Sequence, residues 1–570
     1  MKFFWAKTIL TAGFLLFFAG SVHAATVGDT VNFNVDKSFD INNRMQVSAT
    51  LVQTSPKLYF YIEKSWWSSQ TQSKQSEVLA ILDDLSNEFD NNIYPTLTST
   101  FGAEWNPGID NDPRITILFE PMNSAEGGYF READGYEKLQ VPTSNQREML
   151  YMAVSSINNP GAKIILAHEF THLITFNQKN KMYGVEEDTW LNEARADYSS
   201  TISGYDNNYA GSNLQQRVKD FIYNPSDSIT NWAGTKYDYA SVSLFMHYLV
   251  DHYGVNILSY SLRSGSVGIE SINEALLRRG VTKNFTQVFT NWTIASVVND
   301  CSQNSEYCYI NQNLSNIRVN PALIFLPLTG NSSLSSTNVT KNWTGNWQKI
   351  IGGSGNLKLN FSGSEGLNFA VPYIIYDKNN NYSVDILGLD ADGKGEINVQ
   401  DFGAKYNSLI IIPSLQTKFS GFDDLDFTYP YNFTVSITGK DSETEQALIE
   451  KLLAQIDSLK KQLAALLAQK QGGQGSQGNG TCSQLVTNLY FGVANNGDVT
   501  CLQTVLKNQG ADIYPEGLVT GNFANLTMAA VTRFQEKYAS EILAPLGLSA
   551  GTGYVGPSTR AKINQLLSAS

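Results

Sequence analysis

The stretch Ala167-His168-Glu169-Phe170-Thr171-His172 decides the fold and the chemistry expected of this chain. It has the pattern His-Glu-x-x-His. Positions i and i+4 of a helix share one face, so His168 and His172 can bind one metal ion. Glu169 stands beside them, within reach of a water at that metal. Apolar residues precede and follow the motif, which predicts a helix that is buried on one side.

A second segment, Trp190-Leu191-Asn192-Glu193-Ala194-Arg195-Ala196-Asp197, follows on the chain. Glu193 can supply a third ligand, and two histidines, one carboxylate and one open position are typical of a hydrolytic zinc site. Asp197 lies one turn after Glu193. We expect Asp197, together with Asn192, to support the ligands from behind, with Asp197 accepting a hydrogen bond from a ligand histidine. The alternative is an ordinary amphipathic helix whose two histidines bind nothing.

These two segments together resemble the gluzincin group of zinc metallopeptidases, in particular its secreted hyicolysin-like members. Those proteins pair H-E-x-x-H with a downstream N-E-x-x-x-D. The resemblance covers roughly residues 55–300 and includes residues 144–151 and 237–249. Ala194 and Ala240 stand where these proteins often carry glycine. The resemblance implies a zincin-type fold and one catalytic zinc ion on His168, His172 and Glu193.

The resemblance also implies the roles of two catalytic residues. Glu169 would be the general base that later protonates the leaving amine. A tyrosine on the next helix would stabilise the oxyanion, and we assign that role to Tyr237. Tyr239, Tyr183 and His252 are weaker candidates. Since the chain has 28 tyrosines, plain packing of Tyr237 stays open as an alternative.

Composition limits the possible partners and the location of the chain. Its 570 residues carry a net charge of −13 without a long basic run, which argues against nucleic acid as a partner. Residues 1–24 have the features of a secretory signal peptide: Lys2 and Lys7, an apolar run over 8–20, and a small residue at the end, Ala24. No later stretch predicts a transmembrane anchor.

The four cysteines form two local pairs in the sequence. Cys301 lies near Cys308, and Cys482 lies near Cys501. An even number of cysteines in a secreted chain favours disulfides, although buried thiols are the alternative.

The remaining pattern predicts a multidomain α+β protein. Residues 25–320 form the metallopeptidase domain, which is rich in strands at first and helical from about residue 145. A helix is expected over 76–89 and a buried strand over 114–119. Residues 127–130 would form an edge segment able to pair with an extended peptide.

Short strands separated by Gly, Asn and Asp predict a β-sandwich domain over residues 321–440. They are expected at 356–361, 382–389, 409–412 and 431–437. Asp390 to Asp401 has the spacing of a calcium loop, but Lys394 stands at a ligand position. We therefore favour a hairpin turn there and leave calcium open.

Three further segments complete the chain. Residues 441–470 show a heptad pattern (Ile449, Leu452, Ile456, Leu459, Leu463, Leu466), which predicts a short coiled coil or a helical spacer and would allow a dimer. Residues 471–480 predict a flexible linker. Residues 481–570 resemble the peptidoglycan-binding type 1 module, a three-helix domain of bacterial wall enzymes. The positions that match the module are Asp498–Gln503, Gly521–Phe523, Thr527, Phe534-Gln535 and Gly553–Pro557. A helical bundle without wall affinity is the alternative.

The sequence thus predicts an exported bacterial zinc endopeptidase that acts on proteins or peptides and is held at the cell wall by binding peptidoglycan. Two alternatives stay open: a hydrolase of peptidoglycan cross-bridges, and a non-catalytic, adhesive wall-binding protein.

Overall fold

The computed structural model describes residues 25–123, 127–328, 330–422, 427–438, 452–461, 482 and 484–568. Contacts divide the chain into two compact units, residues 1–451 and 452–570. The predicted signal peptide (1–24) and linker (471–480) lie outside the described residues, as does most of the predicted coiled coil.

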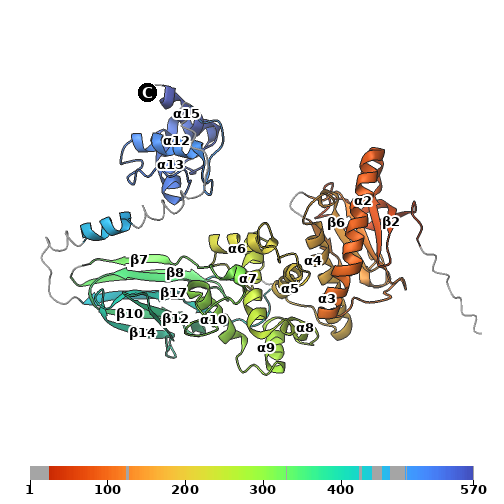
Figure 1. Cartoon of the computed structure of the whole chain (residues 1–570), viewed down its shortest axis with the longest axis horizontal. Helices are drawn as coiled ribbons and strands as arrows, with labels where there is room; N and C mark the ends of the chain where they lie inside the picture. The colour runs from red at the N-terminus through yellow and green to blue at the C-terminus, as the bar shows by residue number, and fades with distance from the viewer. Residues whose placement is uncertain are drawn as a thin grey trace, which may run out of the picture. The chain divides into compact units, whose positions relative to one another are not determined.

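A mixed sheet forms the N-terminal part of the first unit (Figure 1). Within the described residues it has six strands in the order β1-β2-β3-β4-β6-β5. β3, β4 and β6 are parallel neighbours and buried along their whole length, as their nearly continuous apolar sequences require. β5 pairs antiparallel with β6 at the edge, where residues 127–130 were expected. The strands are β1 (Thr30–Asn34), β2 (Gln46–Thr54), β3 (Leu58–Glu63), β4 (Ile115–Glu120), β5 (Gly128–Phe130) and β6 (Met149–Ala153).

Helices cover one face of this sheet and continue into a helical region. The inward side chains of β3 and β4 share one hydrophobic core with α2 and α4, while the opposite face has a small core of its own. The helix expected over 76–89 is α2. The helices of this unit are α1 (Lys64–Ser69), α2 (Gln72–Glu88), α3 (Tyr94–Phe101), α4 (Ala162–Thr175), α5 (Thr189–Ile202), α6 (Asn213–Tyr223), α7 (Lys236–Tyr253), α8 (Asn256–Leu262), α9 (Gly268–Arg278) and α10 (Phe285–Val298).

The second large sheet of this unit follows α10. Its long strands alternate buried and exposed residues, as in β10, so one face packs inward. The strands expected at 356–361, 382–389, 409–412 and 431–437 correspond to β10, β13, β15 and β17. The strands after α10 are β7 (Ala322–Leu326), β8 (Ser332–Thr340), β9 (Gln348–Gly352), β10 (Gly355–Gly363), β11 (Phe369–Ala370), β12 (Pro372–Asp377), β13 (Tyr382–Ile386), β14 (Lys394–Phe402), β15 (Tyr406–Ile411), β16 (Ser414–Leu415) and β17 (Tyr429–Thr438).

The strand-rich region packs tightly on the helical region. Trp343 and Trp347 belong to the helical core, and the indole N–H of Trp347 donates to the carbonyl of Thr293 in α10 (2.9 Å). Residues 25–320 and 321–440 therefore share one compact unit, although the sequence predicts a domain boundary between them.

The segment with calcium-loop spacing forms a turn and a strand. The carboxylate of Asp390 accepts hydrogen bonds from the backbone N–H groups of Asp392 and Lys394 (3.0 and 2.8 Å), and the Lys394 ammonium pairs with Asp392 (3.3 Å). Lys394–Phe402 is β14, so the later acidic residues extend away from the turn. The segment is therefore a tight turn, but it is not the expected hairpin, because β13 before it pairs with β12 and β14 after it pairs with β10.

Both expected disulfides are present. Cys301 is bonded to Cys308, and Cys482 to Cys501. In the part of the chain that the structure describes, no helix combines the length and the apolar character needed to cross a bilayer.

The second unit contains a small helical module with a core of its own. Residues 452–461 are helical, and Leu453, Ile456 and Leu459 are exposed on that helix. The module then forms α12 (Gly497–Asn508), α13 (Asn525–Lys537), the short α14 (Ala539–Ile542) and α15 (Pro557–Ser568).

Two buried glutamines join the helices of this module to its loops. The amide of Gln503 in α12 donates to Thr527 and accepts from the N–H groups of Thr520 and Gly521. The amide of Gln535 in α13 makes the equivalent bonds with Thr559, Thr552 and Gly553. We call these two sets of bonds the glutamine hubs.

Candidate metal centre

α4 brings the two histidines of the motif together. Both lie on the face of α4 that is turned away from the sheet core formed by Leu166, Ala167 and Phe170. The Nε2 atoms of His168 and His172 are 3.2 Å apart, and their rings are nearly perpendicular. The helical spacing of the motif therefore gives the convergence that the sequence predicts.

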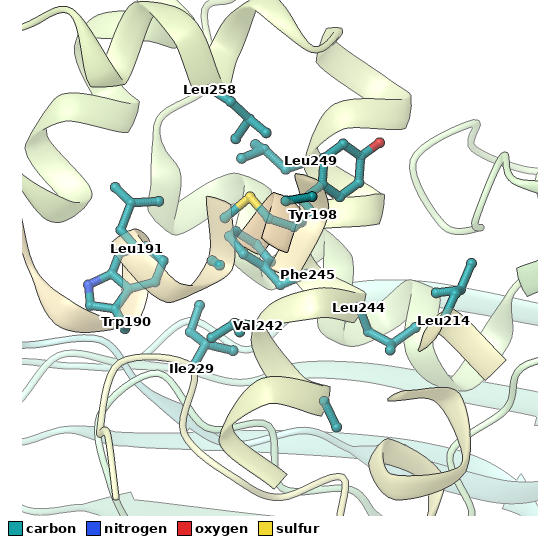
Figure 2. Close-up of a cluster of buried hydrophobic side chains, with 14 of the residues drawn as sticks. Trp190, Leu191, Tyr198, Leu214, Ile229, Val242, Leu244, Phe245, Leu249 and Leu258 are labelled. Carbon is teal, nitrogen blue, oxygen red and sulfur yellow. The ribbon is translucent and has the colours of Figure 1, made fainter. Parts of the chain in front are cut away.

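α5 supplies the third member of the cluster. Trp190, Leu191 and Tyr198 of this helix belong to the buried hydrophobic cluster that also contains Phe245 and Leu249 of α7, and this packing fixes the position of α5 (Figure 2). The opposite side of α5 then carries Glu193 toward α4. Its carboxylate oxygens lie 3.2 Å from Nε2 of His168 and 3.6 Å from Nε2 of His172.

The geometry of this cluster suits a metal ion. Among the described residues, His168, His172 and Glu193 form the one group of three potential ligands whose ligand atoms all lie within 4.8 Å of one another. Ligand atoms about 2.1 Å from a tetrahedral zinc ion lie roughly 3.4 Å from one another. The two Nε2 atoms (3.2 Å apart) and the Nε2 of His168 with Oε2 of Glu193 (3.2 Å) are close to this value, while His172 lies nearest to the other oxygen of Glu193, Oε1 (3.6 Å). We conclude that the three residues could hold a metal ion.

The charges around Glu193 keep its carboxylate ionised, as a metal ligand must be. Burial favours the neutral acid, but His172, His168 and a hydrogen bond from Tyr239 outweigh it and lower the pKa of Glu193 to about 2. Burial likewise opposes charge on His168, yet the bond to Glu193 raises the pKa of this imidazole to about 9. Without a metal the cluster thus retains a proton, which a cation would have to displace.

The support behind the ligands differs in part from the expectation. Oδ1 of Asn192 lies 3.1 Å from Nδ1 of His172, so Asn192 orients that ring. The sequence assigns a histidine contact to Asp197, but the structure places its carboxylate against Arg217 of α6 (2.6 and 3.0 Å) and Asn213 (3.1 Å). Asp197 still acts on His168 through its charge.

The structure favours Tyr239 over Tyr237 as the hydroxyl donor. The hydroxyl of Tyr239 helps to lower the pKa of Glu193, and the ring centroid of Tyr239 lies 6.2 Å from that of His168. Burial raises the pKa of Tyr239 well above its usual value, so the hydroxyl stays protonated. Tyr237 instead stacks on Tyr223 (5.8 Å, 7° between planes). Residues two apart on a helix point in nearly opposite directions, so only one of the two can face α4.

The two remaining candidates are engaged elsewhere. The hydroxyl of Tyr183 donates to the carbonyl of Arg263 (3.1 Å). Nε2 of His252 lies 2.9 Å from the carbonyl of Cys308 beside the disulfide.

A cavity of about 420 Å³ opens beside the cluster. His168 and Glu169 line it, Gly127 and Gly128 form the wall at the sheet edge, and Tyr239 lies across from them. A Cβ atom at Gly128 would lie 3.1 Å from Cγ of Glu169, so the backbone of the edge strand closely approaches the general-base candidate. An extended chain paired with β5 would therefore pass beside Glu169.

Arg217 is the main residue of this cavity that the sequence does not single out. It neutralises Asp197, and its guanidinium lies 4.7 Å from the ring centroid of Tyr239. The only signal in the sequence is indirect, because a buried carboxylate such as Asp197 needs a partner.

Comparison with known proteins does not identify a family. No family model and no curated protein matches the chain. Solved structures with partial similarity include the mitogen of Yersinia pseudotuberculosis, which has 12% identity and a TM-score of 0.15 over 20% of this chain and 92% of that one. The pre-peptidase C-terminal domain of a Bacillus anthracis collagenase has 11% identity and a TM-score of 0.15 over 20% and 96%. The periplasmic lysozyme inhibitor PliG of Aeromonas hydrophila has 11% identity and a TM-score of 0.14 over 21% and 100%. Similarity at this level carries no argument about function.

Proposed function

We propose that the chain is an exported zinc-dependent endopeptidase that hydrolyses peptide bonds of proteins. One observation carries the proposal: His168, a member of the cluster with His172 and Glu193, lines a cavity together with Glu169 and Gly128 of the edge strand. A ligand set with an open side, a general base and a place for an extended peptide are the three elements that metal-assisted peptide hydrolysis needs.

The residues of the chain divide the chemistry between them. When bound, a zinc ion supplies Lewis acidity, which polarises the peptide carbonyl and makes water more acidic. Glu169 takes the proton of the attacking water and delivers it to the leaving amine. The hydroxyl of Tyr239, which is neutral and beside Glu193, donates a hydrogen bond to the developing oxyanion.

β5 orients the substrate. Its outer edge has backbone N–H and C=O groups free to pair with an extended peptide, because β5 is the last strand of the sheet. Pairing there would align the scissile bond with Glu169, since Gly128 leaves room for a close approach.

The setting of the enzyme is part of the same proposal. Two disulfides fit an oxidising compartment, as does the signal-like N-terminal sequence. The resemblance of residues 481–570 to peptidoglycan-binding modules supports attachment to a bacterial wall. We propose that this module keeps the peptidase near protein substrates at the cell surface.

Glu169→Gln is the sharpest test, because it removes the base and keeps the shape of the side chain. We expect about one zinc ion per chain by elemental analysis in wild type and variant alike. We also expect wild type to cleave unfolded casein and to lose this activity when a chelator is added. The variant should cleave casein about 10³-fold more slowly than wild type. Zinc-free wild type that cleaves nothing would contradict the proposal. Release of soluble fragments from isolated wall sacculi, without casein cleavage, would instead favour a cross-bridge hydrolase.

A further inference from the structure

A second cavity, of about 550 Å³, lies at the start of α5, the helix that carries Glu193. Glu186, Glu187, Thr189 and Trp232 line it. Thr189 is the first residue of α5, one turn before Glu193 and on the same face. The ring of Trp232 contacts that of Tyr239 edge-on (4.8 Å). Two residues that line this cavity thus neighbour Glu193 and Tyr239 of the candidate metal centre.

The charge of this cavity is negative on balance. Glu187 is buried and compensated, because Arg195 lies 2.7 Å and Lys179 3.6 Å from its carboxylate. Glu186 is exposed and forms no ion pair with any residue that the structure describes. Glu132 lies near enough to feel its charge and is held by the neutral amide of Asn180 (3.2 Å). A cationic group would therefore be attracted to the mouth of the cavity.

The direction of β5 assigns the cavity to one side of the substrate. β5 runs from Gly128, which lines the first cavity, toward Phe130, and Glu132 comes two residues later, after Arg131, which pairs with Asp134. Antiparallel pairing is slightly more stable than parallel pairing. A peptide antiparallel to β5 would place the residues N-terminal to its scissile bond toward Glu132 and Glu186. Its C-terminal residues would then lie toward Arg217 and Lys236 of the first cavity.

We propose that the cavity lined by Glu186 and Trp232 is the subsite for a basic side chain, lysine or arginine, just N-terminal to the scissile bond. This inference rests on the proposed function. Glu186 supplies the counter-charge, and the indole of Trp232 supplies an aromatic surface for a cation. The enzyme would accordingly cleave after basic residues of extended segments and reject acidic residues at that position.

Peptides that differ at one position test the subsite. Three fluorogenic peptides carry lysine, the uncharged isostere norleucine, or glutamate before the scissile bond. We expect wild type to prefer lysine over norleucine about five- to tenfold in kcat/KM, the size of one partly screened ion pair with a cation–π contact. Glu186→Gln should reduce this ratio to near one, and Glu186→Lys should favour the glutamate peptide. Glu365→Lys, which changes an exposed acid elsewhere in the same unit, should behave as wild type.

Binding separates this inference from the proposed function. Fluorescence titration of the Glu169→Gln protein with the same peptides measures the subsite without turnover. Equal affinities for the lysine and norleucine peptides would overturn the subsite even if wild type is an active peptidase. A lysine preference that Glu186→Gln abolishes, in a chain whose wild type cleaves nothing, would support the subsite and reject the peptidase.

Discussion

The hydroxyl of Tyr239 is the residue-scale feature with the most direct consequence for catalysis. It helps to lower the pKa of Glu193, whereas Tyr237, at the start of α7, stacks on Tyr223. Tyr239→Phe should lower kcat about 10²-fold with little change in KM, the usual effect of losing one oxyanion donor. Tyr237→Phe keeps the ring stack and is the matched control, expected within about twofold of wild type. Steady-state kinetics on one peptide decides between them, and equal losses in both variants would speak against the assignment.

A buried acid outside the metal cluster should make stability depend on pH. Glu120, at the end of β4, is buried and accepts a hydrogen bond from Tyr129 (2.8 Å). Burial, with the charges of Asp40 and Glu63, raises its pKa from 4.5 to about 7. Because the folded pKa is raised, the stabilisation is complete below about pH 4.5 and is lost as pH rises through 7.

Glu120→Gln cannot ionise and should remove this loss. We expect the variant to gain up to about 3 kcal/mol over wild type at pH 8, and little at pH 4.5. Urea unfolding at the two pH values measures the difference. The same pH dependence in both proteins would show that Glu120 is not its source.

The ligand residues were predictable from the sequence because helical periodicity alone brings His168 and His172 together. Support from Asn192 was also predictable, but the sequence assigned the histidine contact to Asp197, whereas the structure gives that contact to Asn192. The choice between them depends on Arg217, which arrives from α6 and binds Asp197. Likewise, the choice between Tyr237 and Tyr239 depends on where α7 begins, and the capping box of Thr235 and Asp238 sets that point.

At the scale of elements, β5 determines how close a substrate can come to the base. A Cβ atom at Gly128 would lie 2.7 Å from the carbonyl oxygen of Tyr151 and 3.1 Å from the side chain of Glu169. Gly128→Ala should therefore displace β5 and lower kcat/KM more than tenfold, with a loss of about 1–3 kcal/mol in stability. Gly388→Ala, where an added Cβ meets nothing within 4 Å, is the control. Activity is compared at a temperature where both variants are folded, and unchanged kcat/KM in Gly128→Ala would argue against substrate pairing at β5.

Elements with strong periodicity or continuous apolar runs were predictable, including β4, α2 and four strands of the second sheet, β10, β13, β15 and β17. The order of strands was not, because it depends on contacts between distant segments. The packing of Trp343 and Trp347 into the helical core also depends on contacts between distant segments. It joins residues 25–320 and 321–440, which differ in composition.

At the scale of the whole molecule, the two compact units have separate cores and should unfold separately. Gln535→Leu leaves the buried N–H groups of Thr552 and Gly553 without their acceptor, a loss of about 3 kcal/mol. We expect calorimetry of the full chain to show two transitions, of which the variant lowers only one, with peptidase activity unchanged. Gln565→Leu, at an exposed position on α15, should lower neither. A shift of both transitions would show that the units are coupled.

The two glutamine hubs have a consequence for the history of this module. Their bonds span the same sequence separations: 24 residues to the threonine, and 17 and 18 to the loop N–H groups. Such a match is the trace that tandem duplication of one helix-and-loop segment leaves. α13 takes part in both hubs. The hydroxyl of Thr527 in α13 accepts a hydrogen bond from the amide of Gln503, and the amide of Gln535 in α13 donates one to the hydroxyl of Thr559. The module thus consists of two repeated units, each a helix with its hub glutamine and the loop and threonine that this glutamine binds. Evolution could add or remove one whole unit and leave every hub glutamine with its partners.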